Sequence, residues 1–262
     1  MNKTSIILML CVFSIFSACK KDNNEDNVMT IIPDKPGEIP GLGETSGELT
    51  GEKFEFPEGI ELEEEITGYA GSREPMAKST SNTAIKASLE KSFLKAERAI
   101  GSLSTQKIIS VGSGNFVRLA LRLKNTTSAK KTIELPAGLI IKSRTGRYQH
   151  GVLLKKTSFT IDANESVLTD LYMYCGNVQK SSSSIAEKYD LSVISNSSSL
   201  HELIDLLKNK KINIEQYLGQ ENGFYDYSGH VGVIQNCLWS ITDSKVGLTD
   251  SNYKDIEELP ND

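Results

Sequence analysis

A series of short apolar runs between residues 117 and 174 constrains the fold more than any other feature of this chain. In the first run, from Val117 to Lys124, aliphatic residues alternate with Arg, Ala and Lys. A period of two puts the apolar side chains on one face of a β-strand and the others on the opposite face. Similar runs, separated by turn residues, follow at 131–135, 139–143, 152–155, 158–161 and 167–174. Short strands at this spacing predict an antiparallel β-sandwich over residues 107–178.

Helical periodicity flanks these strands on both sides. Residues 84–100 carry apolar side chains at steps of three and four and are followed by Gly101, which predicts one amphipathic helix within 78–106. The same spacing recurs in the C-terminal third and predicts a helical subdomain over 179–262, with helices at 200–207, 212–218, 231–241 and 250–259 and a Tyr-rich loop at 224–229. The expected class is therefore α+β, and its strand pattern resembles the immunoglobulin-like modules of bacterial surface proteins.

The stretch between residues 20 and 77 differs from the rest in charge and composition. It contains fifteen acidic and five basic side chains, and it holds five of the seven prolines. A segment of this kind buries too little apolar surface to fold alone. We therefore expect a flexible acidic tether over 19–77. Between residues 51 and 69, Phe54, Ile60 and Ile66 could instead dock on the folded domain, so the state of that part stays open.

The first nineteen residues have the form of an export signal. Lys3 supplies a positive charge, an apolar run extends from Ile6 to Phe16, and Ser17-Ala18-Cys19 closes it. The run falls short of the roughly 20 apolar residues that span a bilayer. These residues resemble the signal peptides of bacterial lipoproteins, in which two small residues precede a cysteine. The resemblance implies removal of residues 1–18 and lipidation of Cys19 on its thiol and amino group.

The charged stretch 20–26 follows the lipidation site directly. It resembles the acidic export signals of some surface lipoproteins, which implies a protein held on the outer membrane by lipid and exposed at the cell surface. No later apolar run is long enough to span a bilayer. Lipid is therefore the expected membrane attachment.

Two cysteines remain once Cys11 leaves with the signal and Cys19 carries lipid. Cys175 ends the last predicted strand, and Cys237 lies within a predicted helix. In an oxidising compartment an even pair suggests a disulfide, which requires α-carbons about 5.5 Å apart. A Cys175–Cys237 disulfide and two unpaired buried thiols are both compatible with the sequence.

A third interpretation comes from the residues that flank these cysteines. Tyr174-Cys175 and the helical stretch Gln235-Asn236-Cys237-Leu238-Trp239 resemble the thioester domains of bacterial surface adhesins, in which a cysteine after an aromatic residue is joined to the glutamine of a Gln-x-Ala-apolar-Trp motif. The resemblance implies Cys175 as the thiol and Gln235 as the acyl donor. Gly176-Asn177 and Cys237 depart from the pattern. Trp239 is expected in the core, and with Tyr172 and Tyr174 it could shield the site.

Conventional catalytic patterns are missing from the sequence. His150, His201 and His230 lack metal-ligand spacing, and there is neither a nucleophile-elbow serine nor a phosphate-binding glycine loop. We therefore expect that the protein is not an enzyme and that it has no metal, no cofactor and no nucleic-acid partner. Eight basic residues could form a patch for an anionic glycan or a bilayer surface, or an ordinary solvated sheet face: Arg118, Arg122, Lys124, Lys130, Lys131, Lys142, Arg144 and Arg147.

Three functions are compatible with these features. The first is a membrane-anchored, surface-exposed lipoprotein that acts as a non-enzymatic binding or adhesion module for a host protein or glycan. The second is a covalent adhesin that uses a Cys175–Gln235 thioester. The third is a structural lipoprotein of the envelope.

Overall fold

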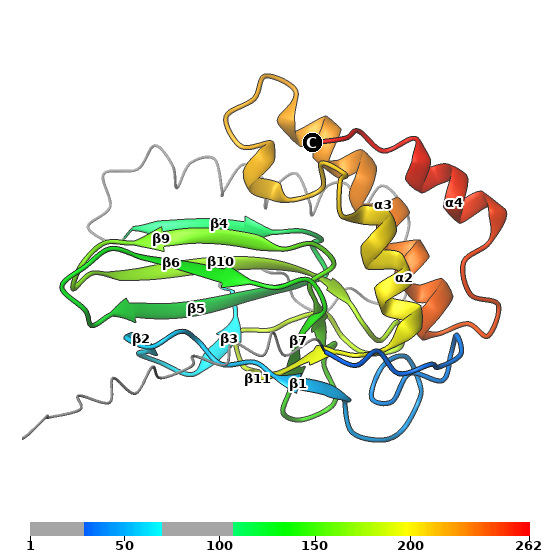
Figure 1. Ribbon diagram of the computed structural model, residues 1–262, viewed down its shortest axis with the longest axis horizontal. Helices are drawn as coiled ribbons and strands as arrows, with labels where there is room; N and C mark the ends of the chain where they lie inside the picture. The colour runs from blue at the N-terminus through cyan, green and yellow to red at the C-terminus, as the bar shows by residue number, and fades with distance from the viewer. Residues whose placement is uncertain (1–28, 70–106) are drawn as a thin grey trace, which may run out of the picture.

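The computed structural model describes residues 29–69 and 107–262 (Figure 1). Its centre is a closed β-barrel of six strands. Around the ring these are β5 (Val117–Asn125), β3 (Ile66–Gly68), β11 (Lys188–Ser195), β7 (Leu139–Ser143), β8 (Gly151–Val152) and β10 (Ser166–Cys175). Antiparallel pairing of β10 with β5 closes the ring.

The expectation of an immunoglobulin-like β-sandwich is therefore wrong. A sandwich consists of two separate sheets packed face to face, whereas here one sheet curls until β10 pairs with β5. The cause lies in β3 and β11, which are outside the stretch 107–178 that the sequence assigned to a sandwich. They fill the gap between β7 and β5. Closure removes the open edges that a sandwich would have to protect.

Short strands extend the barrel at several places. β1 (Gly51–Lys53) pairs with β11, β2 (Ile60–Leu62) pairs with β5, and β4 (Ile108–Gly112) runs parallel to β10. β6 (Lys131–Leu135) and β9 (Thr157–Ile161) form a separate two-stranded sheet. The buried side chains of this small sheet belong to the same apolar cluster as those of the barrel.

Two apolar clusters form the core, and β10 contributes to both. Leu171 and Met173 belong to the cluster inside the barrel, together with the inward side chains of β5. Tyr172 and Tyr174, which alternate with them, belong to the cluster that joins the barrel to the helices. Because successive side chains of a strand point to opposite faces, one strand links the two clusters.

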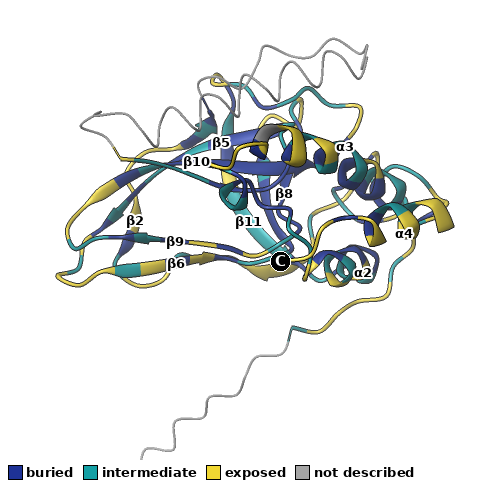
Figure 2. Ribbon diagram, turned by 90° about the horizontal axis from the view of Figure 1, so that it is seen from above, coloured by how far each residue is buried: buried dark blue, intermediate teal, exposed yellow. Residues whose placement is uncertain are grey.

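Three α-helices and one short 3₁₀-helix gather at one end of the barrel (Figures 1 and 2). They are α2 (Ser198–Leu207), η1 (Ile214–Gln216), α3 (Gly223–Thr242) and α4 (Asp250–Glu257). Ser197 caps α2 by accepting a hydrogen bond from the Leu200 N–H, which satisfies one of the free donors of the first turn. Leu200, Leu203 and Leu207 then face the core at helical spacing.

Two helical predictions differ from the structure. Residues 212–218 contain only the single turn of η1, and the Tyr-rich stretch 224–229, expected as a loop, lies within α3. Tyr227 explains the second difference, because its side chain is fully buried and its hydroxyl donates to the Gly114 carbonyl at 2.7 Å. Tertiary contacts therefore extend α3 well before the expected start at residue 231.

The described part of the expected tether, residues 29–69, packs on the domain. It supplies β1, β2 and β3, and Ile39, Leu42 and Ile66 are buried. Some of its acidic side chains pair with basic residues of the barrel. Glu48 binds Lys142, and Glu65 binds Arg144. These ion pairs join part of the acidic segment to the barrel.

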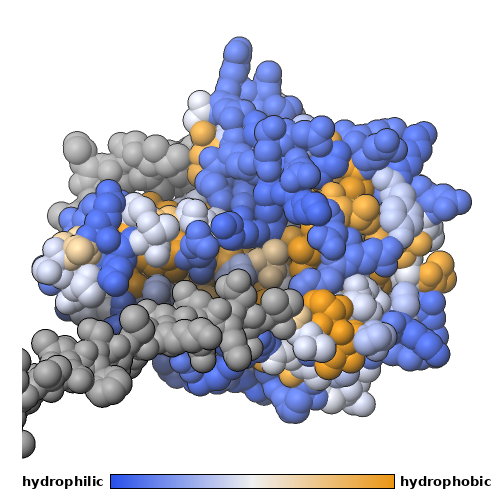
Figure 3. All heavy atoms as spheres, in the orientation of Figure 1, coloured by the Kyte–Doolittle hydropathy of each residue, from blue (hydrophilic) through white to orange (hydrophobic). Residues whose placement is uncertain are grey.

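Most of the expected basic patch is paired in the same way. Arg122 binds Glu64, Lys130 binds Asp162, and Arg118 is buried against Asp170. On the face shown in Figure 3, hydrophilic side chains dominate, with small apolar groups between them. The more exposed pairs, those of Arg122 and Lys130, reduce the net charge of the sheet face and contribute little to stability individually.

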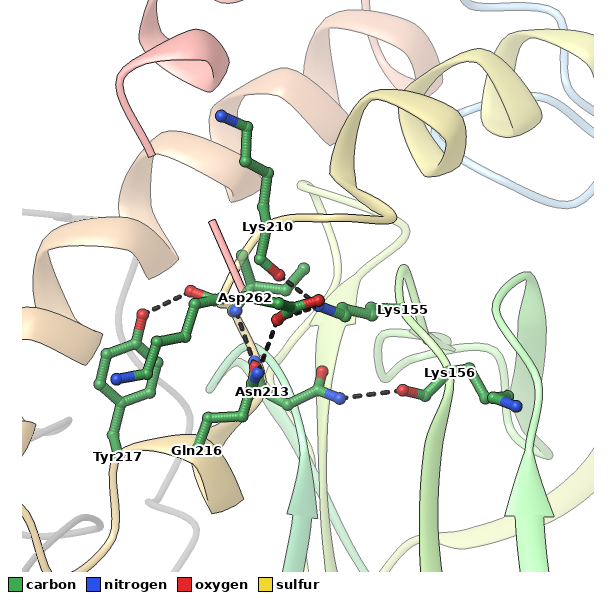
Figure 4. A network of polar contacts seen from close by, with 9 residues as sticks. Lys155, Lys156, Lys210, Asn213, Gln216, Tyr217 and Asp262 are labelled. Carbon is green, nitrogen blue, oxygen red and sulfur yellow. Dashed lines mark hydrogen bonds and ion pairs between the residues drawn. The ribbon is translucent and has the colours of Figure 1, made fainter. Parts of the chain in front are cut away.

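The C-terminus fastens the helical layer to the barrel (Figure 4). Lys155, which follows β8, contacts the Asp262 carboxylate at 2.7 Å and also donates to the Lys210 carbonyl. Gln216 of η1 donates to the same carboxylate at 2.7 Å. Asn213 donates to the Lys156 carbonyl at 3.0 Å. One side-chain cluster therefore joins the barrel, η1 and the end of the chain.

Candidate functional site

The candidate site forms where β10 ends at Cys175. The ladder partner of Cys175 is Gly151 of β8, and the next bond on that side runs from the Gly176 N–H to the His150 carbonyl at 3.0 Å. In an antiparallel pair of this register, the N–H and C=O of Cys175 point away from β8. These two groups therefore need partners from elsewhere in the fold.

Gln235 of α3 supplies both partners. The Cys175 N–H donates to Gln235 Oε1 at 2.9 Å, and Gln235 Nε2 donates to the Cys175 carbonyl at 2.9 Å. The side-chain amide thus takes the place of a neighbouring strand. Cys175 and Gln235 are both almost completely buried, so the pair lies in a region from which water is excluded.

The Cys175 sulfur is held by a main-chain donor. The Asn177 N–H donates to Sγ at 3.3 Å. Burial raises the pKa of the Cys175 thiol to about 12, although the Asn177 amide and the Trp239 indole partly oppose this effect. The thiol is therefore protonated at neutral pH, and only a small fraction exists as the nucleophilic thiolate.

Trp239 lies one turn after Gln235 on α3. It is partly buried, and its ring packs on Phe116 with centroids 5.6 Å apart. Within the part of the chain that the structure describes, the indole nitrogen has no hydrogen-bond partner, but it is close enough to Cys175 to lower the pKa of the thiol. Tyr172 and Tyr174, which the sequence placed near the site, are fully buried in the cluster between β10 and the helices.

Cys237 lies in a different environment from Cys175. The structure contains both as free, buried thiols. Each residue of a helix turns by about 100°, so residues two positions apart point in nearly opposite directions. Cys237 therefore does not share the face of Gln235. Burial raises the pKa of Cys237 to about 11, and Asp255 and Asn252 of α4 are its polar neighbours. The structure therefore brings Gln235, and not Cys237, to Cys175.

Asn177 is a site residue whose role the sequence did not reveal. Its side chain is almost completely buried and fully bonded: Oδ1 accepts the His150 N–H at 3.1 Å, and Nδ2 donates to the carbonyls of Gly41 at 3.3 Å and Gly43 at 3.0 Å. The only sequence signal was the Gly176-Asn177 pair, which departs from the thioester pattern. A contact between residues 134 or more positions apart has no local signature.

His150 and Lys180 complete the polar surroundings of the site. The Ser143 N–H donates to His150 Nδ1 at 3.0 Å, and His150 Nε2 lies 3.3 Å from Lys180 Nζ. Burial, followed by the nearby positive charges of Lys180 and Lys142, lowers the pKa of His150 to about 4. His150 is therefore a neutral structural residue at neutral pH. His201 and His230 lie elsewhere, bonded to Ser195 and Tyr217.

Several further sequence predictions fall on residues that the structure does not describe. The signal peptide 1–18, the lipidation site Cys19 and the amphipathic helix within 78–106 lie outside 29–69 and 107–262. Across these two ranges, no three His, Cys, Asp or Glu side chains are grouped to hold a metal ion. No helix within the same ranges combines the length and apolarity needed to cross a bilayer.

Comparisons with protein families, curated proteins and solved structures give no match for this chain.

Proposed function

We propose that this protein is a lipid-anchored surface adhesion module that captures its partner covalently, through a thioester between Cys175 and Gln235. One observation carries the proposal: the Gln235 side-chain amide contacts the main chain of Cys175 through two hydrogen bonds of 2.9 Å. These bonds hold the Gln235 amide against the main chain of the residue that carries the thiol.

The proposed reaction has two balanced steps. First, the Cys175 sulfur attacks the amide carbon of Gln235, a C–S bond forms, the C–N bond breaks, and the amide nitrogen leaves as ammonia with the thiol proton. Second, an amine of the partner attacks the same carbon, an amide bond forms, and the Cys175 thiol is released. The final link joins the partner to Gln235.

Burial suits the first product of this reaction. A thioester hydrolyses when water reaches it, and both residues that would form it have 1% or less of their surface exposed. Close packing therefore protects the acyl group until a partner arrives. The membrane attachment in the proposal rests on the sequence of residues 1–19 alone.

Labelling with a small amine tests the proposal. Isotopically labelled methylamine should be incorporated into the wild-type protein, and peptide mass spectrometry should locate the label on Gln235. Cys175→Ala and Gln235→Ala should abolish incorporation. Cys237→Ala is the matched control, because Cys237 is also a buried cysteine but lies near α4, and this variant should retain labelling. Equal labelling of wild type and Cys175→Ala would overturn the covalent proposal and leave non-covalent binding.

A further inference from the structure

A short glycine-rich segment, Gly37 to Thr45, crosses the molecule beside the candidate site, and we call it the strap. It is a compact loop held by its own bonds: the Thr45 hydroxyl donates to the Gly37 carbonyl at 2.8 Å, and the Gly41 N–H donates to the Thr45 carbonyl at 3.2 Å. The strap precedes β1 in the chain, and no sequence pattern connected it with Cys175.

One end of the site is bonded directly to the strap. The Gly43 N–H donates to the Gly176 carbonyl at 2.8 Å, and Asn177 Nδ2 donates to the carbonyls of Gly41 and Gly43. Leu42 is fully buried beside Gly176, since a Cβ placed on Gly176 would lie only 2.9 Å from a Leu42 methyl group. The strap thus covers the two residues that follow Cys175.

The strap is also bonded to the end of α3. The Gly37 N–H donates to the Ile241 carbonyl at 2.8 Å. Gly43 has φ of +57°, and a Cβ there would lie 1.9 Å from the Thr242 carbonyl oxygen, so only glycine allows this approach. The strap therefore bridges β10 and α3, the two elements that carry Cys175 and Gln235.

We infer that the strap is a gate over the Cys175–Gln235 pair and that the Asn177 side chain is its latch. This inference rests on the proposed thioester. A closed site keeps water from the thioester, but it also keeps out the amine of a protein partner, so the site has to open for the second step. The main-chain N–H of Asn177 holds the sulfur, while its side chain holds the strap. Asn177 is thus a positioning residue that controls access to the reacting atoms and takes no part in bond formation.

The variant Asn177→Ala tests the latch, because it removes the bonds to Gly41 and Gly43, together with the one from the His150 N–H, but keeps the main-chain N–H that faces sulfur. Losing these bonds should increase the open fraction of the strap roughly tenfold. Asn125→Ala is the matched control: Asn125 ends β5, is also a fully buried asparagine, and donates to main-chain carbonyls outside the strap, those of Ala129, Ile161 and Asp162.

Access should be measured with two amines of different size. In the wild type, methylamine should react with Gln235 much faster than a bulky amine such as biotinylated cadaverine. Asn177→Ala should lower the ratio of the methylamine rate to the bulky-amine rate by about tenfold, whereas Asn125→Ala should leave this ratio unchanged. An unchanged ratio in Asn177→Ala, or an equal change in Asn125→Ala, would overturn the gate.

A second measurement separates the gate from the thioester. In the Gln235→Ala background no thioester is possible, so alkylation of Cys175 by iodoacetamide, followed by peptide mass spectrometry, reports strap opening directly. Adding Asn177→Ala should raise this rate roughly tenfold, and adding Asn125→Ala should not. If wild-type protein fails to bind methylamine but this difference holds, the proposed function fails and the gate stands. If Cys175 is alkylated at the same rate in the two asparagine variants, the gate is overturned, whatever the outcome for the thioester.

Discussion

The side-chain amide of Gln235 forms both of the main-chain hydrogen bonds that Cys175 leaves open at the end of β10. This contact joins the barrel to α3 through residues separated by 60 positions. It has a structural consequence, because it satisfies two buried backbone groups, and a chemical one, because it holds a side-chain amide beside the residue that carries a thiol.

Loss of the Gln235 amide should destabilise the fold. In the Cys175→Ala background, where no thioester forms and the amide stays intact, Gln235→Ala leaves the N–H and C=O of residue 175 buried without partners, and we expect the free energy of unfolding in urea to fall by about 2 to 4 kcal/mol. Asn236→Ala, an exposed neighbour on the same helix, should change it by less than about 0.5 kcal/mol. Cys175→Ala also prevents a thioester, but it keeps the bonds between the main chain of residue 175 and the Gln235 amide. It should therefore lower the free energy of unfolding less than removal of the amide does. Equal effects of Gln235→Ala and Asn236→Ala would contradict the role of the amide.

The two cysteines should respond differently to alkaline pH. A thiol whose pKa is raised in the folded state keeps its proton while the unfolded thiol, with a pKa of about 8.5, loses it. The protein therefore loses stability as pH rises between these two values, by up to roughly 1.4 kcal/mol per pH unit for each such thiol. Cys237, with a pKa raised to about 11, should contribute to this loss between about pH 9 and 11.

Urea unfolding across that pH range compares the variants. Cys237→Ala should flatten the decline in stability relative to the wild type. Cys175→Ala should not, because a sulfur held in a thioester has no proton to lose. A clear flattening in Cys175→Ala would instead indicate a free Cys175 thiol.

Residues 29–69 should behave as part of the barrel. Ile66 of β3 has only 2% of its surface exposed, and Ile66→Ala removes packing atoms from the core. We expect a loss of about 2 to 4 kcal/mol in the free energy of unfolding. Ile32, with 49% of its surface exposed, is the control, and Ile32→Ala should change stability by about 0.5 kcal/mol or less. Similar small effects at both positions would support a loosely attached tether.

The C-terminal cluster should stabilise the contact between the barrel and the helical layer. The Lys155 side chain is mostly buried and binds Asp262 at 2.7 Å, so Lys155→Met should lower the free energy of unfolding by about 1 kcal/mol. Lys156→Met, which removes an exposed pair with Glu134, should have almost no effect. A larger effect at Lys156 would be inconsistent with the cluster.

The stability that Lys155 contributes through Asp262 should be lost in acid. Burial would raise the pKa of Asp262, but the hydrogen bonds from Lys155 and Gln216 outweigh it, and the net shift is downward. A lowered carboxyl pKa contributes stability above the unfolded value and loses it as pH falls through the folded value. The difference between wild type and Lys155→Met should therefore shrink below about pH 4, as urea unfolding at several pH values can show.

The strands from 117 to 175 follow from their alternation, but the closed barrel does not. β3 has only three residues, and β11 carries a register shift between Leu191 and Ile194 that interrupts a simple period of two. Both strands therefore lack a clear pattern, although both are needed to complete the ring. A sandwich was the natural expectation without them.

The candidate site was predictable in part. The resemblance to thioester domains implied that Cys175 and Gln235 meet, and in the structure the Gln235 amide contacts the main chain of Cys175. Asn177 and the strap gave no such signal, because a segment rich in Gly, Pro and Glu has the composition of a linker. What fixes its conformation is long-range: carbonyls of Gly41 and Gly43 bonded to Asn177, and Leu42 buried in the core.

The intact mass of the purified wild-type protein tests the central claim most directly. Closure of the thioester expels one ammonia, so the account predicts a wild-type mass lower than the sequence mass, after correction for processing and lipid, by one ammonia. Cys175→Ala and Gln235→Ala should each have the full mass expected for their sequence. A wild-type mass with no loss of ammonia, in protein that has not been exposed to amines, would contradict the account.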